Sequence, residues 1–295
     1  MTDARPFRFG VNLLDIGDRA AWREKCRKAE RLGYDVILVP DHIGFPAPFP
    51  ALVAAGEGTT RPRLGTFVLN AGFYNPTLLA RDVAATDQLT EGRLELGLGA
   101  GYVKAEFDTA GLPFGTGGER LAHLRATVER LRELLEDPEH RPAAAQTRVP
   151  LLLGGNGDRM LRLAARHAEI VGFIGAVDDG VGNLSLIPPD ALAERVAFAR
   201  EAAGDRADEI EWNVLVQTVE LTDDPDAAIA RWCEQVPYLD ADQLRALPTA
   251  LFGSPEQIAA ELVAHRERYG FSYVTVLDAS MEAFAEVIAL VRGSS

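Results

Sequence analysis

The segment LELGLGA at residues 94–100 lies between two segments whose apolar residues have the spacing of amphipathic helices. The first, residues 76–89, begins with a proline, which is favoured at the first position of a helix. The second, residues 118–136, repeats leucine or valine every three or four positions. A largely apolar run between two helices is typical of a parallel strand that is buried on both faces. We therefore predict a helix, a strand and a helix in this part of the chain.

The same alternation continues in both directions along the chain, because aliphatic and β-branched runs are separated by helical patterns. The predicted strands are 7–13, 35–40, 63–70, 94–100, 149–155, 169–175, 212–221 and 273–277. The predicted helices begin after Asp18 and then cover 76–89, 118–136, 157–168, 189–203, parts of 225–247, 254–269 and a last segment that includes Phe284 and Val291. This alternation predicts parallel strands joined by right-handed crossovers.

Two architectures fit such a pattern: a closed (β/α)8 barrel, also called a TIM barrel, and an open doubly wound sheet. Eight strand–helix units, with no early GxGxxG motif that opens a helix, favour the barrel. No linker interrupts the pattern, so we expect residues 1–295 to form a single domain. We interpret residues 43–58, 101–117 and 176–188 as loops that shape a site and determine its substrate.

The charge balance of the chain excludes some classes of partner. Its 44 acidic and 30 basic residues give a net charge of −14, and no basic stripe for binding a nucleic acid is visible. The N-terminus has no charged-then-apolar leader, and no apolar run approaches the ~18 residues of a membrane span. We therefore expect a cytoplasmic protein that binds neither nucleic acid nor membrane.

The residues that commonly bind metals follow no recognisable pattern. Cys26 and Cys233 lie far apart in predicted helices, which argues against both a disulfide framework and a metal-ligand spacing. The five histidines form no HExxH or paired-ligand motif. We expect two reduced thiols and no metal ion.

In a barrel of this kind the active site is built where the strands end, so the residues at those ends are the most informative. The second strand ends with Asp41 and His42, which brings a carboxylate and an imidazole together. Taken alone, this pair has a simpler interpretation, because an aspartate often caps a turn and a single histidine is often a satisfied polar residue.

The third and fourth strands end in unusual patterns. Alternation breaks in the segment from Asn70 to Pro76, where a bulge could lie against a flat ligand. Gly97, Gly99 and Gly101 remove side chains from one face of the fourth strand. This would admit a planar ring, but small residues could equally serve only to fit the curvature of the barrel.

The fifth strand ends in Gly154, Gly155, Asn156 and Gly157 and runs directly into a helix. Free amides at a helix N-terminus, next to glycines that let a ligand approach the backbone, form an anion site that commonly takes phosphate. A plain strand–helix turn would explain the same pattern about as well.

Taken together, the four strand ends resemble those of the luciferase-like monooxygenases and their deazaflavin-dependent relatives. These proteins are (β/α)8 barrels that use reduced FMN or coenzyme F420. The resemblance covers nearly the whole chain, and its most specific parts are Asn75-Pro76, residues 87–93 (DQLTEGR) and residues 96–101 (LGLGAG).

The resemblance implies roles for individual residues. His42 lies beside the cofactor as a candidate catalytic residue, and a bulge with a non-prolyl cis peptide bond falls near Phe67 and Val68. Asn70 contacts the edge of the ring, and the loop Gly154–Gly157 binds the phosphate. The residues that it assigns to cofactor binding are Asp41, Phe67, Val68, Asn70, Ala100, Gly154, Gly155, Asn156 and Gly157.

One position departs from the family pattern. Several deazaflavin-dependent dehydrogenases carry a glutamate just after the glycines of the fourth strand as a proton donor, whereas this chain has Tyr102. The departure argues against sugar-phosphate oxidation. Tyr102 could donate a proton or only shape the pocket, and the ordinary tyrosine pKa near 10 suits an acid better than a base.

Three hypotheses about function follow. The first is a coenzyme F420-dependent oxidoreductase that moves a hydride between the deazaflavin C5 and a small organic substrate, with His42 or Tyr102 handling a proton. The second is a monooxygenase that uses reduced FMN and O2, and the third is a non-catalytic protein that binds a flavin or deazaflavin. The resemblance also implies a homodimer formed through barrel helices.

Overall fold

Eight parallel strand positions close into a barrel in the computed structural model, which describes residues 5–178 and 184–293. Around the barrel the strands are ordered β3-β2-β1-β13-β10-β7-β6-β5-β4, with β3 and β4 as two parts of one position. Pairing of Leu64 with Leu94 and of Gly65 with Glu95 joins β3 to β5 and closes the ring. The barrel strands are β1 (Arg8–Asn12), β2 (Val36–Val39), β3 (Arg63–Thr66), β4 (Leu69–Asn70), β5 (Leu94–Gly99), β6 (Leu151–Gly154), β7 (Ile170–Phe173), β10 (Glu211–Val216) and β13 (Phe271–Leu277).

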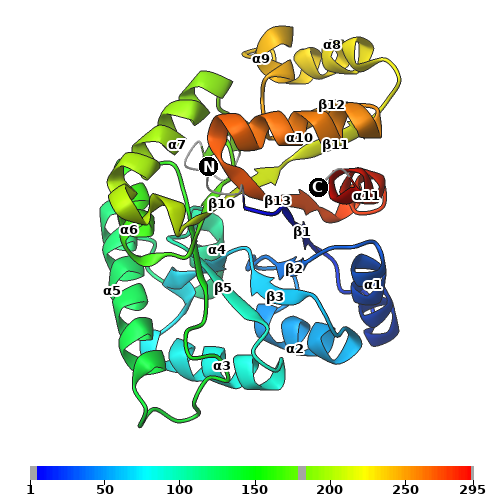
Figure 1. Cartoon of the computed structure of the whole chain (residues 1–295). Coiled ribbons are helices and arrows are strands. Elements are labelled where there is room, and N and C mark those ends of the chain that lie inside the picture. The colour runs from blue at the N-terminus through cyan, green and yellow to red at the C-terminus, as the bar shows by residue number, and fades with distance from the viewer. Residues whose placement is uncertain (1–4, 179–183, 294–295) are drawn as a thin grey trace.

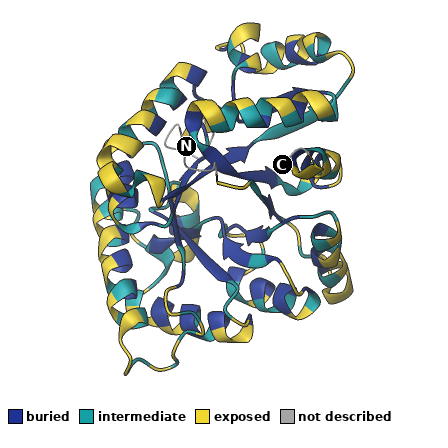
Figure 2. Ribbon diagram, in the orientation of Figure 1, coloured by how far each residue is buried: buried dark blue, intermediate teal, exposed yellow. Residues whose placement is uncertain are grey.

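Helices surround these strands, and Figure 1 shows them on the outside of the barrel. Their inner faces are buried and their outer faces are exposed, whereas the strands are buried almost throughout (Figure 2). The helices are α1 (Arg19–Arg31), α2 (Pro48–Gly58), α3 (Pro76–Leu89), α4 (Lys104–Ala110), α5 (Gly117–Glu136), α6 (Asp158–His167), α7 (Pro189–Ala203), α8 (Pro225–Gln235), α9 (Ala241–Arg245), α10 (Pro255–Tyr269) and α11 (Phe284–Gly293). The predicted (β/α)8 barrel is confirmed.

Local signals in the sequence explain where several helices begin. Asp18 caps α1 by accepting a hydrogen bond from the Ala21 N–H, and Asn75 caps α3 just before Pro76. Thr116 and Ser254 form capping boxes at the starts of α5 and α10. These caps fix the points at which the chain leaves each strand-end loop.

The prediction of one strand over residues 212–221 is wrong. The Gln217 N–H bonds to the Thr249 carbonyl at 2.7 Å, which takes the chain out of the barrel. From there β11 (Thr218–Leu221) pairs with β12 (Ala250–Gly253) in a separate parallel sheet. The sequence pattern could not reveal this change of partner, because the residues on both sides of Gln217 have a strand pattern.

The segments interpreted as loops contain more regular structure than predicted. Within 43–58, α2 begins at Pro48 and packs on the barrel, and within 101–117 lies the short helix α4. Within 176–188, β8 (Ala176–Asp178) pairs with β9 (Leu184–Leu186), and residues 179–183 lie outside the described residues. The helix α2 was not predicted because five of its positions are Ala or Gly, so it lacks the regularly spaced large apolar residues that indicate a helix.

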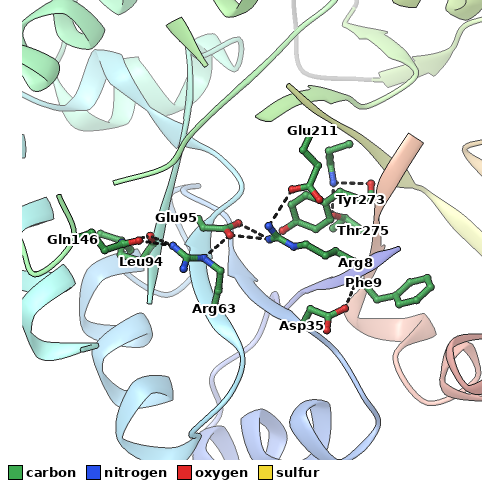
Figure 3. Close-up of polar contacts among 11 residues, drawn as sticks. Arg8, Phe9, Asp35, Arg63, Leu94, Glu95, Gln146, Glu211, Tyr273 and Thr275 are labelled. Atoms are coloured by element: carbon green, nitrogen blue, oxygen red, sulfur yellow. Dashed lines mark hydrogen bonds and ion pairs between the residues drawn. The ribbon is translucent and has the colours of Figure 1, made fainter. Parts of the chain in front are cut away.

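A charged network closes the barrel at the N-terminal ends of its strands (Figure 3). Arg8 of β1 donates to Glu95 at 2.7 Å and to Glu211 at 3.0 Å, and Arg63 of β3 pairs with Glu95 at 2.6 Å. Burial raises the pKa of Glu211, while Arg8 opposes that shift. The ring of Tyr273 packs under the Arg8 guanidinium at 4.6 Å. This end of the barrel therefore contributes to stability and leaves the opposite end for a site.

Among residues 5–178 and 184–293, no helix is long and apolar enough to cross a membrane. The same part of the chain contains no group of three or more His, Cys, Asp or Glu residues that could hold a metal ion. Cys26 is buried in α1, Cys233 is partly buried in α8, and both are free thiols.

Candidate functional site at the C-terminal mouth of the barrel

Asp41 connects two strand ends at the mouth. Its Oδ2 accepts a hydrogen bond from the Asn70 N–H at 3.0 Å, and the Tyr74 hydroxyl also donates to its carboxylate. Burial raises the pKa of Asp41, and the bonds from Asn70 and Tyr74 oppose that shift. The carboxylate thus holds the segment that follows β4 against the end of β2.

Asn70 is buried at the point where β4 ends. Its Oδ1 accepts from the Gly72 N–H at 3.0 Å, which caps a short 3-10 turn over residues 71–73. Gly101 packs against the same side chain with φ +74°, and a Cβ at that position would lie 2.3 Å from Asn70 Oδ1. Among the described residues Asn70 Nδ2 has no hydrogen-bond acceptor, so it is the donor that remains for a ligand.

The peptide bond between Phe67 and Val68 is cis, at the place where the family resemblance predicts such a bond. The glycines of β5 lie against this segment. A Cβ on Gly97 would approach the Thr66 carbonyl oxygen to 2.0 Å, and one on Gly99 would approach Val68 Cγ2 to 2.9 Å. Gly97 and Gly99 therefore allow neighbouring strands to pack closely, which agrees with the interpretation that small residues fit the curvature of the barrel.

His42 is held by contacts on three sides. Its Nδ1 lies 2.8 Å from Oε1 of Glu106, which belongs to the first turn of α4. The rings of Phe45 and Tyr102 meet the imidazole edge-on, with centroids 5.7 Å and 6.0 Å away. The predicted residues His42 and Tyr102 are therefore neighbours.

Glu106 is the site residue that the sequence reasoning missed. It lies within residues 101–117, a segment assigned to the mouth, and it is a carboxylate four positions after Tyr102. These two features of the sequence could have identified Glu106 as a candidate site residue. Its contact with His42 depends on the turn of α4 over the end of β2, which no local pattern predicts.

The loop Gly154–Gly157 leads into α6 without a side-chain cap. Gly157 is the N-cap residue and makes no capping hydrogen bond, and a Cβ there would meet nothing within 4 Å. The first N–H groups of α6 are therefore available to an anion. The side chain of Asn156 contacts the neighbouring strand end instead. Its Nδ2 donates to the Ala176 carbonyl at 2.5 Å, and its Oδ1 is buried without a partner.

The predicted residues thus fall into two groups on adjoining strands. Asp41, Asn70 and the segment around Val68 form one continuous set with the end of β5, where Ala100 follows the strand. The Gly154–Gly157 loop follows β6, which pairs with β5 through Leu98 and Leu153. A groove of about 590 Å³ between α2 and α3 lies on the outer surface of the barrel and belongs to neither group.

Sequence comparison identifies the family of the chain. The model of the luciferase-like monooxygenase family matches residues 6–245 of this chain. The chain belongs to the luciferase-like monooxygenase family. The family match includes every predicted site residue from Asp41 to Gly157.

Relatives of this luciferase-like protein include F420-dependent glucose-6-phosphate dehydrogenases. The one from Kribbella flavida is 30% identical over 228 residues, which are 70% of this chain and 66% of the relative. The one from Intrasporangium calvum is 32% identical over 174 residues, which are 50% of this chain and 51% of the relative. The matched regions therefore span between one half and two thirds of these two relatives.

Solved structures agree with the barrel over nearly its whole length. An F420-dependent secondary alcohol dehydrogenase in complex with an F420-acetone adduct aligns with a TM-score of 0.75 and 17% identity, covering 98% of this chain and 100% of that one. The EDTA monooxygenase of Chelativorans aligns with a TM-score of 0.75 and 14% identity, covering 99% and 94%. At these identities the alignments establish the luciferase-like fold.

Proposed function

We propose that this protein is an F420-dependent oxidoreductase that moves a hydride between the deazaflavin C5 and a small organic substrate. The observation that carries the proposal is the combination, at one barrel mouth, of an oriented imidazole and an uncapped helix N-terminus. The first provides a group that handles a proton, and the second provides a phosphate site. The similarity to F420-dependent glucose-6-phosphate dehydrogenases supports the choice of cofactor.

The residues at the mouth fit such a cofactor. The first N–H groups of α6 and the open space beside Gly157 would hold its phosphate. Asn70 Nδ2 would donate to the edge of the ring, next to Val68 and Ala100. When bound, the deazaflavin supplies two-electron hydride chemistry at C5.

The chain itself contributes orientation and proton transfer. Nδ1 of His42 is engaged by Glu106, so Nε2 is the ring nitrogen that can exchange a proton with a substrate hydroxyl or carbonyl. Tyr102, edge-on to His42, is the second candidate for this role. Asp41 keeps Asn70 in place, and the rings of Phe45 and Tyr102 meet the imidazole edge-on and help to orient it.

The substrate class remains a small organic molecule in this proposal. Tyr102 stands where the sugar-phosphate dehydrogenases of the family have a glutamate, so we do not extend the proposal to glucose 6-phosphate. We further propose that residues 1–295 form one domain, that the protein is cytoplasmic and, on the family resemblance, that it is a homodimer. Light scattering coupled to gel filtration measures the mass directly against a protomer of 31.9 kDa.

Titration of the purified protein with F420 and with FMN, followed by cofactor fluorescence, tests the proposal. We expect micromolar or tighter binding of F420 and much weaker binding of FMN. Tight binding of FMN without binding of F420 would instead support the FMN-dependent monooxygenase. Binding of either cofactor with no turnover of any alcohol or carbonyl compound would support the non-catalytic alternative.

Gly157→Asp tests the phosphate site by separating folding from binding. An aspartate at this N-cap position should stabilise α6 by about 1 kcal/mol and at the same time repel an anion. We expect weaker F420 binding without loss of stability. Gly157→Ala is the matched control, since the space there is open and no charge is added.

A further inference from the structure

Glu106 approaches His42 from a different part of the chain, 64 positions along the sequence. The Glu106 side chain is 15% exposed and the His42 side chain is 31% exposed, so the bond between them is partly buried. We propose that Glu106 is a positioning residue that fixes the tautomer of His42 and keeps Nε2 free for proton transfer. This inference rests on the proposed function for the identity of the reaction.

The hydrogen bond determines which ring nitrogen carries the proton. A carboxylate oxygen only accepts, so Nδ1 of a neutral His42 must be the N–H that donates to Glu106 Oε1. Nε2 then carries the lone pair. Among the described residues it has no hydrogen-bond partner, and it is not one of their buried unpaired atoms, so it is open to the mouth.

The position of Glu106 in its helix argues against a purely structural role. Glu106 is the third residue of α4, where a glutamate commonly reaches back to cap its own helix. Such capping boxes occur in this protein at Thr116–Glu119, Asp240–Gln243 and Ser254–Gln257. In α4 the N-cap residue is Val103, no capping bond is made, and the carboxylate contacts the imidazole instead.

The other groups around His42 support the same arrangement. The rings of Phe45 and Tyr102 stand nearly perpendicular to the imidazole, at 88° and 86°, and restrict its rotation. Asp41 lies close enough to interact electrostatically with both His42 and Glu106, but its carboxylate bonds to Asn70 and Tyr74. Glu106 is therefore the acidic side chain that is hydrogen-bonded to the ring.

The tautomer can be measured in cofactor-free protein by two-dimensional 1H–15N NMR of the histidine rings. The spectrum contains five histidines, and the His42→Asn variant identifies the signals of His42. At a pH where the ring is neutral, we expect the Nδ1–H tautomer of His42 in the parent protein. Glu106→Ala should move the ring toward the Nε2–H tautomer, and Glu106→Asp should restore part of the original signal.

Asp108→Asn is the matched control. Asp108 lies on the same short helix and pairs with Lys104 on its exposed side, so this change alters the charge of α4 without touching His42. The tautomer should be unchanged in this variant. A parent protein with His42 in the Nε2–H form, or an unchanged ring in Glu106→Ala, would overturn the proposal.

Kinetics provides the second readout. We expect Glu106→Ala to lower kcat by about 10- to 100-fold, as the loss of a group that orients a reactive histidine does, with the affinity for F420 unchanged. In a double variant that also carries His42→Asn, Glu106→Ala should cause no further loss of kcat. A further loss would contradict the proposal that Glu106 acts through His42. The titration of the parent with F420 tests the proposed function separately, since the tautomer is measured without the cofactor.

Discussion

The backbone N–H of Asn70 lies 3.0 Å from Oδ2 of Asp41, which ties the end of β4 to the end of β2. The same carboxylate accepts from the Tyr74 hydroxyl, and burial raises its pKa. Asp41 therefore holds the segment that follows β4 in place.

Removing the Asp41 carboxylate should loosen this segment. Asp41→Ala leaves two donors without their acceptor, so we expect a loss of about 1 to 3 kcal/mol in the free energy of unfolding and weaker binding of F420. Asp41→Asn keeps one acceptor and should lose less. Urea denaturation and fluorescence titration measure the two effects, with the exposed Asp190→Asn as control. Unchanged cofactor binding in Asp41→Ala would count against the supporting role.

Gly97 of β5 should tolerate no side chain. A Cβ there would lie 2.0 Å from the backbone oxygen of Thr66, which cannot move without displacing β3. We expect Gly97→Ala to lower the free energy of unfolding by about 3 kcal/mol or more. Gly117→Ala is the control, because its nearest neighbour would be 3.8 Å away, and a similar loss in both variants would disprove the packing argument.

The charged network at the closed end of the barrel should depend on Glu95. Its side chain is 3% exposed and pairs with both Arg8 and Arg63, so Glu95→Leu leaves Arg63 without its carboxylate partner and Arg8 with Glu211 alone. We expect a loss of about 3 to 5 kcal/mol in urea denaturation. The exposed pair of Glu24 and Arg31 provides the control, and Glu24→Gln should have little effect. Equal stability of the two variants would show that water replaces the network.

Glu261 on α10 should make stability depend on pH. Burial raises its pKa from 4.5 to about 7, and Arg245 opposes the shift. Because the folded state keeps this proton over a pH range in which the unfolded state has lost it, stability should fall as the pH rises from about 4.5 to about 7.

The variant Glu261→Gln removes this titration. The difference in free energy of unfolding between this variant and the parent should be about 1 to 2 kcal/mol more favourable to the variant at pH 8 than at pH 5. This amount is smaller than the full pKa shift would give, because the side chain is partly exposed. Urea denaturation at both pH values measures the difference. Glu267→Gln on the same helix is the exposed control, and an equal response of both variants would contradict the assignment.

Much of the barrel could be predicted from the sequence because its signals are local. The helix from Pro76 to Leu89 begins after a capping asparagine and ends where predicted, and the strand at 94–99 is buried on both faces. The exit of the chain at Gln217 and the helix α2 were not predicted. The first depends on a hydrogen bond to Thr249, and the second lacks the large apolar residues that mark a helix.

The sequence by itself determined the order of strands and helices and favoured the closed barrel, because spacing, caps and turn residues act over a few positions. It also marked Asp41, His42, Tyr102 and the Gly154–Gly157 loop. Only the tertiary structure decided that Asp41 supports Asn70 and that Glu106 engages His42. These contacts join segments 29 and 64 positions apart, and their geometry depends on how the closed barrel brings its strand ends together.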